Sequence, residues 1–318
     1  MHTTKHRPQH LDEMVGQEPI KRKARIAIQA ALQRGEPLPH TLLTSTGGGL
    51  GKTSFAQILA NEMFSPLVMT TGQCLVSPSD LRRIIVSLEQ NSVLLVDEFQ
   101  NVGRAAAEEL LLVLEDRILN INVGSNCAPL RIEVPPFTLI AASTEPESIS
   151  PPLQQRFGLT FCFDFYAEME IKQIIRDTFT RWSIEIDDDA ALTLAQRARG
   201  IPRVALRLSE RVRDVGQAKG SPRISFEMVQ LTMRIEGIDS LGLSRHEQHL
   251  LRVLKDAEPR AVSARSLALA LGVGVNTTIG VLEPGLVRLG LMNIGAGGRR
   301  LTEKGMQHLR DASTTEVV

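Results

Sequence analysis

Gly47-Gly48-Gly49-Leu50-Gly51-Lys52-Thr53-Ser54 is the stretch that decides the fold of this chain. It follows the apolar run 41–43 and leads into the amphipathic segment 55–60, so the local order is strand, glycine loop and helix. This order predicts a P-loop, because glycines let backbone N–H groups turn toward a phosphate and a new helix presents its positive dipole end there. The residues expected to bind nucleotide in this loop are Gly49, Gly51, Lys52, Thr53 and Ser54.

Two side chains of the loop are expected to carry its chemistry. Lys52 reaches the β- and γ-phosphates of ATP in this prediction, and the Thr53 hydroxyl is a ligand of Mg²⁺. The loop departs from the standard pattern at one position, because Thr46 stands where a glycine is usual, six residues before the lysine. A β-branched residue resists positive φ, so we expect this loop to shift or to bind nucleotide less tightly.

A second motif follows in the run Val93-Leu94-Leu95-Val96-Asp97-Glu98. A continuous apolar run that ends in two carboxylates indicates a buried parallel strand with acids at its carboxyl end. Ligands of open α/β sheets bind at that edge. We therefore expect Asp97 to coordinate Mg²⁺ through water and Glu98 to polarise the water that attacks the γ-phosphate. The alternative is a core strand followed by a solvated acidic turn.

The composition is that of an ordinary globular protein and limits the possible partners. The 318 residues are 42% hydrophobic and 23% charged with a formal net charge of zero, so any DNA-binding surface must be local. No apolar run approaches a membrane span, and the amino terminus lacks the apolar region of a signal sequence. The three cysteines lie far apart without metal-ligand spacing, which favours a cytoplasmic location.

The organisation along the chain predicts an α/β protein with additional helical parts. Apolar runs that alternate with helical patterns indicate a parallel sheet, with strands at 41–44, 67–71, 93–96 and 137–142. A helix at 105–114 is followed by two alternating runs around a Gly/Asn turn, which predict an inserted β-hairpin over 118–134. The predicted domains are an ATPase domain at 1–166, a helical lid at 167–237, a winged helix at 238–310 and a disordered tail at 311–318.

The order and spacing of these motifs resemble the RuvB family, the hexameric AAA+ motors of bacterial Holliday junction branch migration. The resemblance covers nearly the whole chain, from Arg7-Pro8 to about Leu309. It rests on several segments in register, among them Val15-Gly16-Gln17 near the amino terminus and the run 135–140 before the fourth strand. It implies an AAA+ ATPase that uses ATP and Mg²⁺, forms a hexameric ring and acts on duplex or junction DNA.

The resemblance also assigns roles to single residues. Thr144 resembles the sensor 1 residue beside the γ-phosphate, and Arg156 resembles an arginine finger that reaches the site of the neighbouring subunit. Arg203, in the turn Gly200-Ile201-Pro202-Arg203, resembles the sensor 2 arginine. The resemblance further implies nucleotide contacts from Arg7 and Tyr166, and DNA contacts from Arg299 and Arg300 in the wing. The hairpin at 118–134 implies a RuvA-like junction-binding partner.

The chain departs from the family pattern at several positions. The acidic strand continues Phe99-Gln100 where the family has Ile-His, and Glu145 follows sensor 1 where the family has arginine. Val275 and Ile294 occupy positions of the winged helix that are usually basic. We therefore consider two functions: an ATP-driven ring motor that moves junction DNA, and a nucleotide-dependent assembly switch without processive translocation. A clamp-loader or transposition-type adaptor fits the terminal winged helix less well.

Overall fold

The computed structural model describes residues 7–121 and 130–315, with side chains up to residue 311. The chain divides into two compact units, each described here by itself. The first unit comprises Met1–Ser183 and Gly200–Arg207, and the second comprises Ile184–Arg199 and Leu208–Val318. Helix α8 (Pro202–Ala218) belongs to both units, because its first residues lie in the first one.

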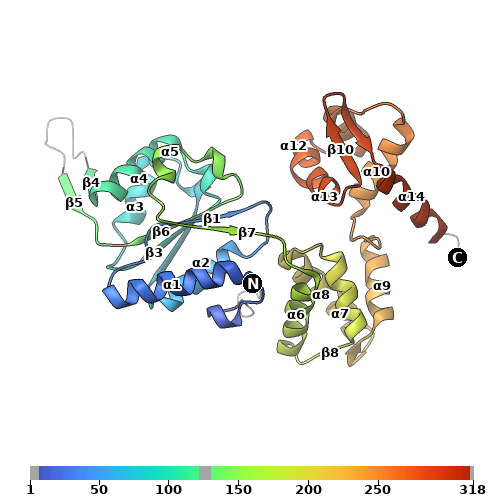
Figure 1. Ribbon diagram of the computed structural model, residues 1–318, viewed down its shortest axis with the longest axis horizontal. Coiled ribbons are helices and arrows are strands. Elements are labelled where there is room, and N and C mark those ends of the chain that lie inside the picture. The colour runs from blue at the N-terminus through green and yellow to red at the C-terminus, as the bar shows by residue number, and fades with distance from the viewer. Residues whose placement is uncertain (1–6, 122–129, 316–318) are drawn as a thin grey trace. The chain divides into compact units, whose positions relative to one another are not determined.

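The first unit contains a five-stranded sheet in the order β2-β3-β6-β1-β7, with every neighbouring pair parallel (Figure 1). The strands are β1 (Thr41–Ser45), β2 (Leu67–Thr71), β3 (Val93–Asp97), β6 (Thr138–Ser143) and β7 (Leu159–Phe163). The predicted parallel α/β sheet is thus confirmed. The edge strand β7 was not predicted, since its exposed alternate residues make its apolar pattern short.

Helices cover this sheet because its strands are apolar on both faces. The helices of this unit are α1 (Glu18–Arg34), α2 (Lys52–Glu62), α3 (Pro78–Ile85), α4 (Arg104–Asp116), α5 (Pro151–Gln154) and α6 (Glu168–Arg181). Leu94 and Leu139 of the sheet pack in one core with Leu81 of α3 and Leu110 of α4. On α2, Phe55 contacts the rings of Phe161 and Phe163 of β7. Helix α2 also contacts β1, β3 and β6, so helices pack on both faces of the sheet.

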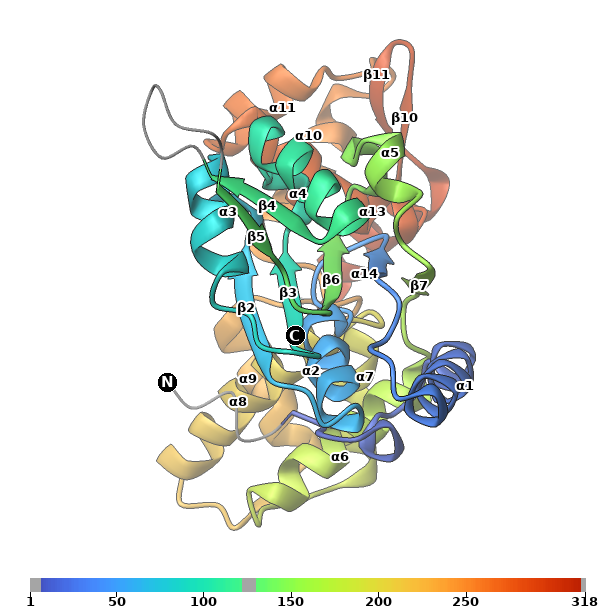
Figure 2. The ribbon, with the colours of Figure 1, turned by 90° about the vertical axis from the view of Figure 1, so that its left-hand side faces the viewer.

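The predicted hairpin is present as β4 (Ile118–Ile121) and β5 (Leu130–Glu133), which pair antiparallel. Figure 2 shows this hairpin alongside α4, and Leu119 is fully buried there. The turn of the hairpin, residues 122–129, lies outside the described residues.

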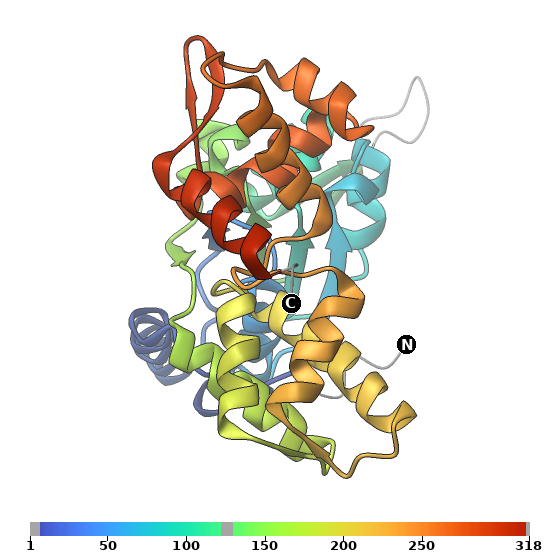
Figure 3. The same cartoon turned by 90° about the vertical axis from the view of Figure 1, so that its right-hand side faces the viewer.

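The second unit contains helices of the lid and a winged helix, which can be followed in Figure 3. Its lid helices are α7 (Asp188–Arg197) and α9 (Phe226–Glu236), with the short parallel pair β8 (Glu185–Ile186) and β9 (Arg223–Ile224). The winged helix comprises α10 (Arg245–Ala257), α11 (Ala264–Leu271), α12 (Val275–Thr277), the π-helical turn η6 (Thr278–Leu282), α13 (Glu283–Arg288), the antiparallel pair β10 (Met292–Gly295) and β11 (Gly298–Leu301), and α14 (Glu303–Thr315).

The winged helix has an apolar core of its own, built mostly from leucines such as Leu250, Leu267, Leu286 and Leu291. Its last helix corrects one prediction. The sequence predicted a disordered tail from residue 311, whereas α14 continues to Thr315 because no glycine or proline interrupts residues 306–315. Within the described residues, no single helix is long and apolar enough to cross a membrane; a pair that passes by length and composition, Ala264–Leu271 with Val275–Arg288, is bent by 104°.

Candidate nucleotide-binding and catalytic site

The P-loop connects the end of β1 to the start of α2, as the glycine run predicts. Gly49 and Gly51 adopt φ values of 82° and 102°, a backbone conformation that favours glycine. Thr46 does not have a positive φ. The strain that we expected at Thr46 is therefore absent. The residues of the loop with positive φ are Gly49 and Gly51, and a glycine adopts this conformation without strain.

Lys52 begins α2 and points into the loop. Its side chain is buried, with 8% of the residue exposed, and its ammonium donates to the Ser45 hydroxyl. Ser45 in turn donates to the carbonyl of Gly47 at 2.7 Å. Burial lowers the pKa of Lys52, and the neighbouring carboxylates of Asp97 and Glu98 oppose that change. The loop thus holds a desolvated cation whose charge a bound phosphate would compensate.

Thr53 and Asp97 come together as expected for a magnesium site. The Thr53 hydroxyl donates to Asp97 Oδ2 at 2.7 Å, so one hydroxyl and one carboxylate oxygen lie at the same place. Mg²⁺ prefers few protein ligands and completes its shell with water and phosphate oxygens. The described residues hold no group of three or more His, Cys, Asp or Glu that could bind a metal by itself. The donor set therefore fits Mg²⁺ brought with a nucleotide.

Glu98 follows Asp97 in a conformation that is uncommon for a side-chain-bearing residue, with φ of 52°. Its backbone N–H donates to Asp97 Oδ1 at 3.0 Å, and its carboxylate accepts from Asn101 Nδ2 at 3.2 Å. Asn101 ends the short 3-10 turn η4 (Phe99–Asn101). Such backbone outliers cluster at functional sites, which supports a catalytic position for Glu98.

Thr144 directly follows β6 and is bound by a residue that the sequence reasoning did not assign to the site. Gln100 Nε2 donates to Thr144 Oγ1 at 3.3 Å, and Gln100 Oε1 accepts from the Ser143 hydroxyl at 2.8 Å. The only feature of the sequence that drew attention to Gln100 was that it stands where the family usually has histidine. Its partners lie more than 40 residues away along the chain and could not be identified from spacing.

The sensor 2 turn packs directly on the P-loop. The backbone N–H of Arg203 donates to the Gly49 carbonyl at 3.3 Å, and a Cβ on Gly49 would lie 2.7 Å from Cβ of Arg203. Tyr166 donates to the Leu50 carbonyl at 3.4 Å, and its backbone N–H donates to the Gly200 carbonyl at 3.0 Å. Burial raises the pKa of the Tyr166 phenol, so this group stays protonated as a donor. These contacts bring Tyr166 and Arg203 to the nucleotide loop.

Arg7 and Arg156 are both exposed. Arg7 is exposed, and its segment is attached to α2 because Asn61 Nδ2 donates to the backbone of the neighbouring Gln9 at 2.9 Å. Arg156 follows α5 and forms an ion pair with Glu115 of α4, with 43% of its side chain exposed. The structure therefore leaves the predicted role of Arg156 in a neighbouring subunit as a prediction.

The wing arginines differ from each other. Arg299 forms two hydrogen bonds with the carboxylate of Glu283, at 2.8 and 3.0 Å, and the side chains are only 16% and 2% exposed. Arg299 therefore has a buried acidic partner on α13, and its predicted phosphate contact stays a prediction. Arg300 is exposed and remains the wing residue suited to a phosphate contact. Val275 and Ile294 are also exposed, so apolar groups occupy this surface where basic ones were usual.

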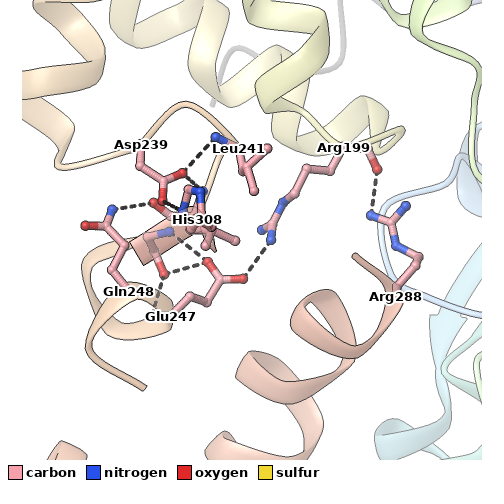
Figure 4. Close-up of polar contacts among 9 residues, drawn as sticks. Arg199, Asp239, Leu241, Glu247, Gln248, Arg288 and His308 are labelled. Atoms are coloured by element: carbon pink, nitrogen blue, oxygen red, sulfur yellow. Dashed lines mark hydrogen bonds and ion pairs between the residues drawn. The ribbon is translucent and has the colours of Figure 1, made fainter. Parts of the chain in front are cut away.

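A polar cluster joins the end of α7 to the winged helix within the second unit (Figure 4). Arg199 Nη1 donates to Glu247 of α10 at 2.7 Å, and the Arg199 carbonyl accepts from Arg288 of α13 at 2.8 Å. Asp239 binds His308 of α14 at 2.9 Å. Arg199 immediately precedes the turn 200–203 in the sequence. The winged helix therefore contacts a residue that is adjacent to this turn along the chain.

The fold and the site define a P-loop ATPase of the AAA+ class with a helical lid and a carboxyl-terminal winged helix. Three family models match in succession: the Holliday junction DNA helicase RuvB P-loop domain over residues 6–163, the RuvB AAA lid domain over 166–239, and the RuvB C-terminal winged helix domain over 240–310. The chain belongs to the RuvB family.

Relatives and solved structures agree with this assignment. The chain is 40% identical over 306 residues to the Holliday junction branch migration complex subunit RuvB of Fervidobacterium nodosum, covering 95% of this chain and 88% of that protein. It is 38% identical to the subunit of the same name from Thermotoga petrophila, covering 96% and 92%. The structure of the RuvB Holliday junction branch migration motor of Thermotoga maritima matches with a TM-score of 0.85 at 37% identity, covering 96% of this chain and 98% of that one.

Proposed function

We propose that this chain is an ATP-hydrolysing motor that drives branch migration of Holliday junction DNA in recombination and repair. The observation that carries the proposal is the convergence of Lys52, Thr53, Asp97 and Arg203 on one loop. Relatives that match over nearly the whole chain are named as subunits of a branch migration complex. In the proposal the protein works in the cytoplasm, as six copies in a ring around duplex DNA.

Each residue has a defined task in the proposed hydrolysis. Lys52 and Arg203 hold the phosphates, and Glu98 orients and polarises the attacking water while Thr144 positions it beside the γ-phosphate. Arg156 stabilises the transferring phosphoryl group in the site of the next subunit. Thr53 and Asp97 would hold Mg²⁺, which would supply positive charge that offsets the charge of the phosphates.

The proposal extends to DNA and to a partner protein. Arg300 contacts phosphates without reading bases, so binding is independent of sequence and sensitive to salt. The β4–β5 hairpin is the proposed docking element for a RuvA-like junction-binding protein. Its exposed Leu130 provides an apolar contact next to the turn.

A nucleotide-dependent assembly switch is the second candidate, favoured by the winged helix. Arg299 is bound to Glu283, and Val275, Ile279 and Val281 leave an uncharged exposed face on the neighbouring helices. An apolar face at this place predicts weak phosphate binding there. Such a protein would use ATP to change partners without moving DNA.

ATP turnover with and without four-way junction DNA distinguishes the two functions. The motor predicts hydrolysis that junction DNA stimulates, and junction-dissociating activity that is lost in Glu98→Gln. The same variant should still bind ATP, because its carboxamide retains the shape of the side chain. Slow hydrolysis that DNA leaves unchanged, with no strand separation from a junction, would instead establish the switch.

A further inference from the structure

Two carboxamides on the turn η4 contact two different catalytic side chains. Gln100 binds Thr144, and Asn101 binds Glu98. We propose that Gln100 and Asn101 are positioning residues for ATP hydrolysis, which hold the sensor hydroxyl and the catalytic carboxylate in their working orientations. This inference rests on the proposed ATPase function and adds the residues that align its catalytic groups.

The Gln100 carboxamide determines which way the Thr144 hydroxyl can donate. Because Gln100 Nε2 donates to Thr144 Oγ1, the hydroxyl oxygen acts as acceptor on that side, and its own proton is directed elsewhere. The remaining direction is open for donation to a γ-phosphate oxygen or to the attacking water. The other end of the amide accepts from Ser143, a buried residue at the end of β6. Gln100 is thereby fixed at both ends.

Asn101 acts in the same way on Glu98. Its Nδ2 donates to Oε2 of the carboxylate at 3.2 Å, so that oxygen has a partner and Oε1 is left to accept from a water. A general base works only when its lone pair lies within hydrogen-bond reach of the proton that it accepts. Without Asn101, the exposed Glu98 side chain has more rotamers available and meets that requirement less often.

The turn that carries both amides is rigidly held. Phe99 is buried with 3% exposed and packs edge-on against Phe157, at 6.2 Å between ring centroids. The backbone of Glu98 passes so close to Gly72 that a Cβ there would lie 2.3 Å from the Glu98 carbonyl oxygen. The Asn101 N–H closes the turn onto the same carbonyl at 2.9 Å. Two side chains on one fixed turn can therefore align groups from β3 and β6 together.

Kinetics of single variants test the proposal. In Gln100→Ala and Asn101→Ala we expect kcat for ATP to fall about 10-fold to 100-fold, the cost typical of misplaced catalytic groups. The dissociation constant for ATP, measured with the full-length protein, should not change, since neither residue contacts the P-loop lysine. Gln173→Ala, which removes an exposed amide of α6, is the matched control and should retain the parent rate.

Two further variants separate positioning from a general structural role. Gln100→His keeps a ring N–H donor and should recover part of the rate lost in Gln100→Ala. The double variant Gln100→Ala with Thr144→Val should be no slower than Thr144→Val alone, because both changes remove the same interaction. Losses that multiply, or a Gln100→Ala protein that binds ATP poorly, would overturn the proposal.

The wild-type protein distinguishes failure of this inference from failure of the proposed function. If the wild-type chain hydrolyses ATP and both amide variants match its rate, the positioning role is wrong and the ATPase stands. If the wild-type chain binds ATP without hydrolysing it, with or without junction DNA, both are wrong. Melting temperatures of all variants within the range of the control show that the comparison is made between folded proteins.

Discussion

At the scale of single residues, the backbone conformation of the P-loop decides which substitution matters. Gly49 and Gly51 occupy the left-handed region, and Gly49 also lies against Arg203. Thr46 lies in ordinary backbone, so the chain tolerates a β-branched residue there. A glycine run predicts that some of its residues have positive φ. Which of them do so depends on the contacts that the folded loop makes.

Thr46→Gly should therefore leave nucleotide affinity unchanged. No backbone strain is present to be relieved, and the added freedom of glycine in the unfolded chain should lower stability by about 0.5 kcal/mol. Calorimetric titration with ATP and thermal unfolding of both proteins provide the measurement. Tighter binding by Thr46→Gly would indicate that the threonine side chain obstructs the phosphate site.

At the scale of elements, an ion pair between Arg299 and the buried Glu283 connects the wing to helix α13. Glu283 begins α13, and Arg299 lies on β11, with a further backbone pairing between Val262 and Arg299. Removal of one partner of a buried pair leaves a charge without compensation, which is far more costly than loss of a surface contact. The pair with Glu283 thus stabilises the wing at Arg299, whereas the neighbouring Arg300 is exposed.

The two wing arginines should respond differently to substitution by alanine. Arg299→Ala should destabilise the winged helix by about 3 kcal/mol, because Glu283 remains buried and unpaired. Arg300→Ala should leave stability unchanged and reduce the dependence of log affinity on log salt by about one unit, the effect of one lost phosphate contact. Thermal unfolding and DNA titrations at several salt concentrations measure both effects. An Arg300→Ala protein with the parent affinity and salt slope would exclude the wing as a DNA contact.

The cluster around Arg199 joins the lid to the winged helix within the second unit, so we expect it to couple the two. Glu247→Gln weakens the pair with Arg199 and keeps the size of the side chain. This variant should retain its basal ATP turnover and lose most of the stimulation by junction DNA. Asp256→Asn, an exposed acid on the same helix α10, is the matched control. Equal stimulation of both variants would show that the Arg199 pair has no coupling role.

At the scale of the whole molecule, the single chain does not contain a complete catalytic site if Arg156 acts across subunits. Its partner in this chain is Glu115, and its exposed position is compatible with a subunit boundary. The proposed ring gives each P-loop an arginine from the neighbouring copy. Hydrolysis is then a property of the assembly.

Mixing two inactive variants tests this arrangement. Arg156→Ala should bind ATP normally and lose about 10³-fold or more in turnover, and Lys52→Ala should lose nucleotide binding. Mixed rings should recover some hydrolysis, because an intact P-loop can then face an intact Arg156. ATP turnover of the mixtures at known ratios is the measurement. If well-mixed oligomers show no recovery, Arg156 acts within its own chain.

The sequence alone determined the features that depend on neighbours along the chain. The strand–glycine–helix order placed the P-loop, and the apolar run before Asp97 and Glu98 placed the acidic strand, because each pattern spans only a few residues and reflects local geometry. Four of the five parallel strands follow from the alternation of such segments, and the edge strand β7 does not. The resemblance to the RuvB family rested on the same motifs and their spacing, and the family models and relatives confirmed it.

Only the tertiary structure decided which side chains meet. Gln100 finds Thr144 across 44 residues, Arg199 finds Glu247 across 48, and Arg299 finds Glu283 across 16. Such pairs depend on how helices and strands pack, because burial determines whether a charge must be compensated by the chain or remains free for a ligand. The sequence showed an arginine in the wing, and only the fold showed that it pairs with the buried Glu283 of α13.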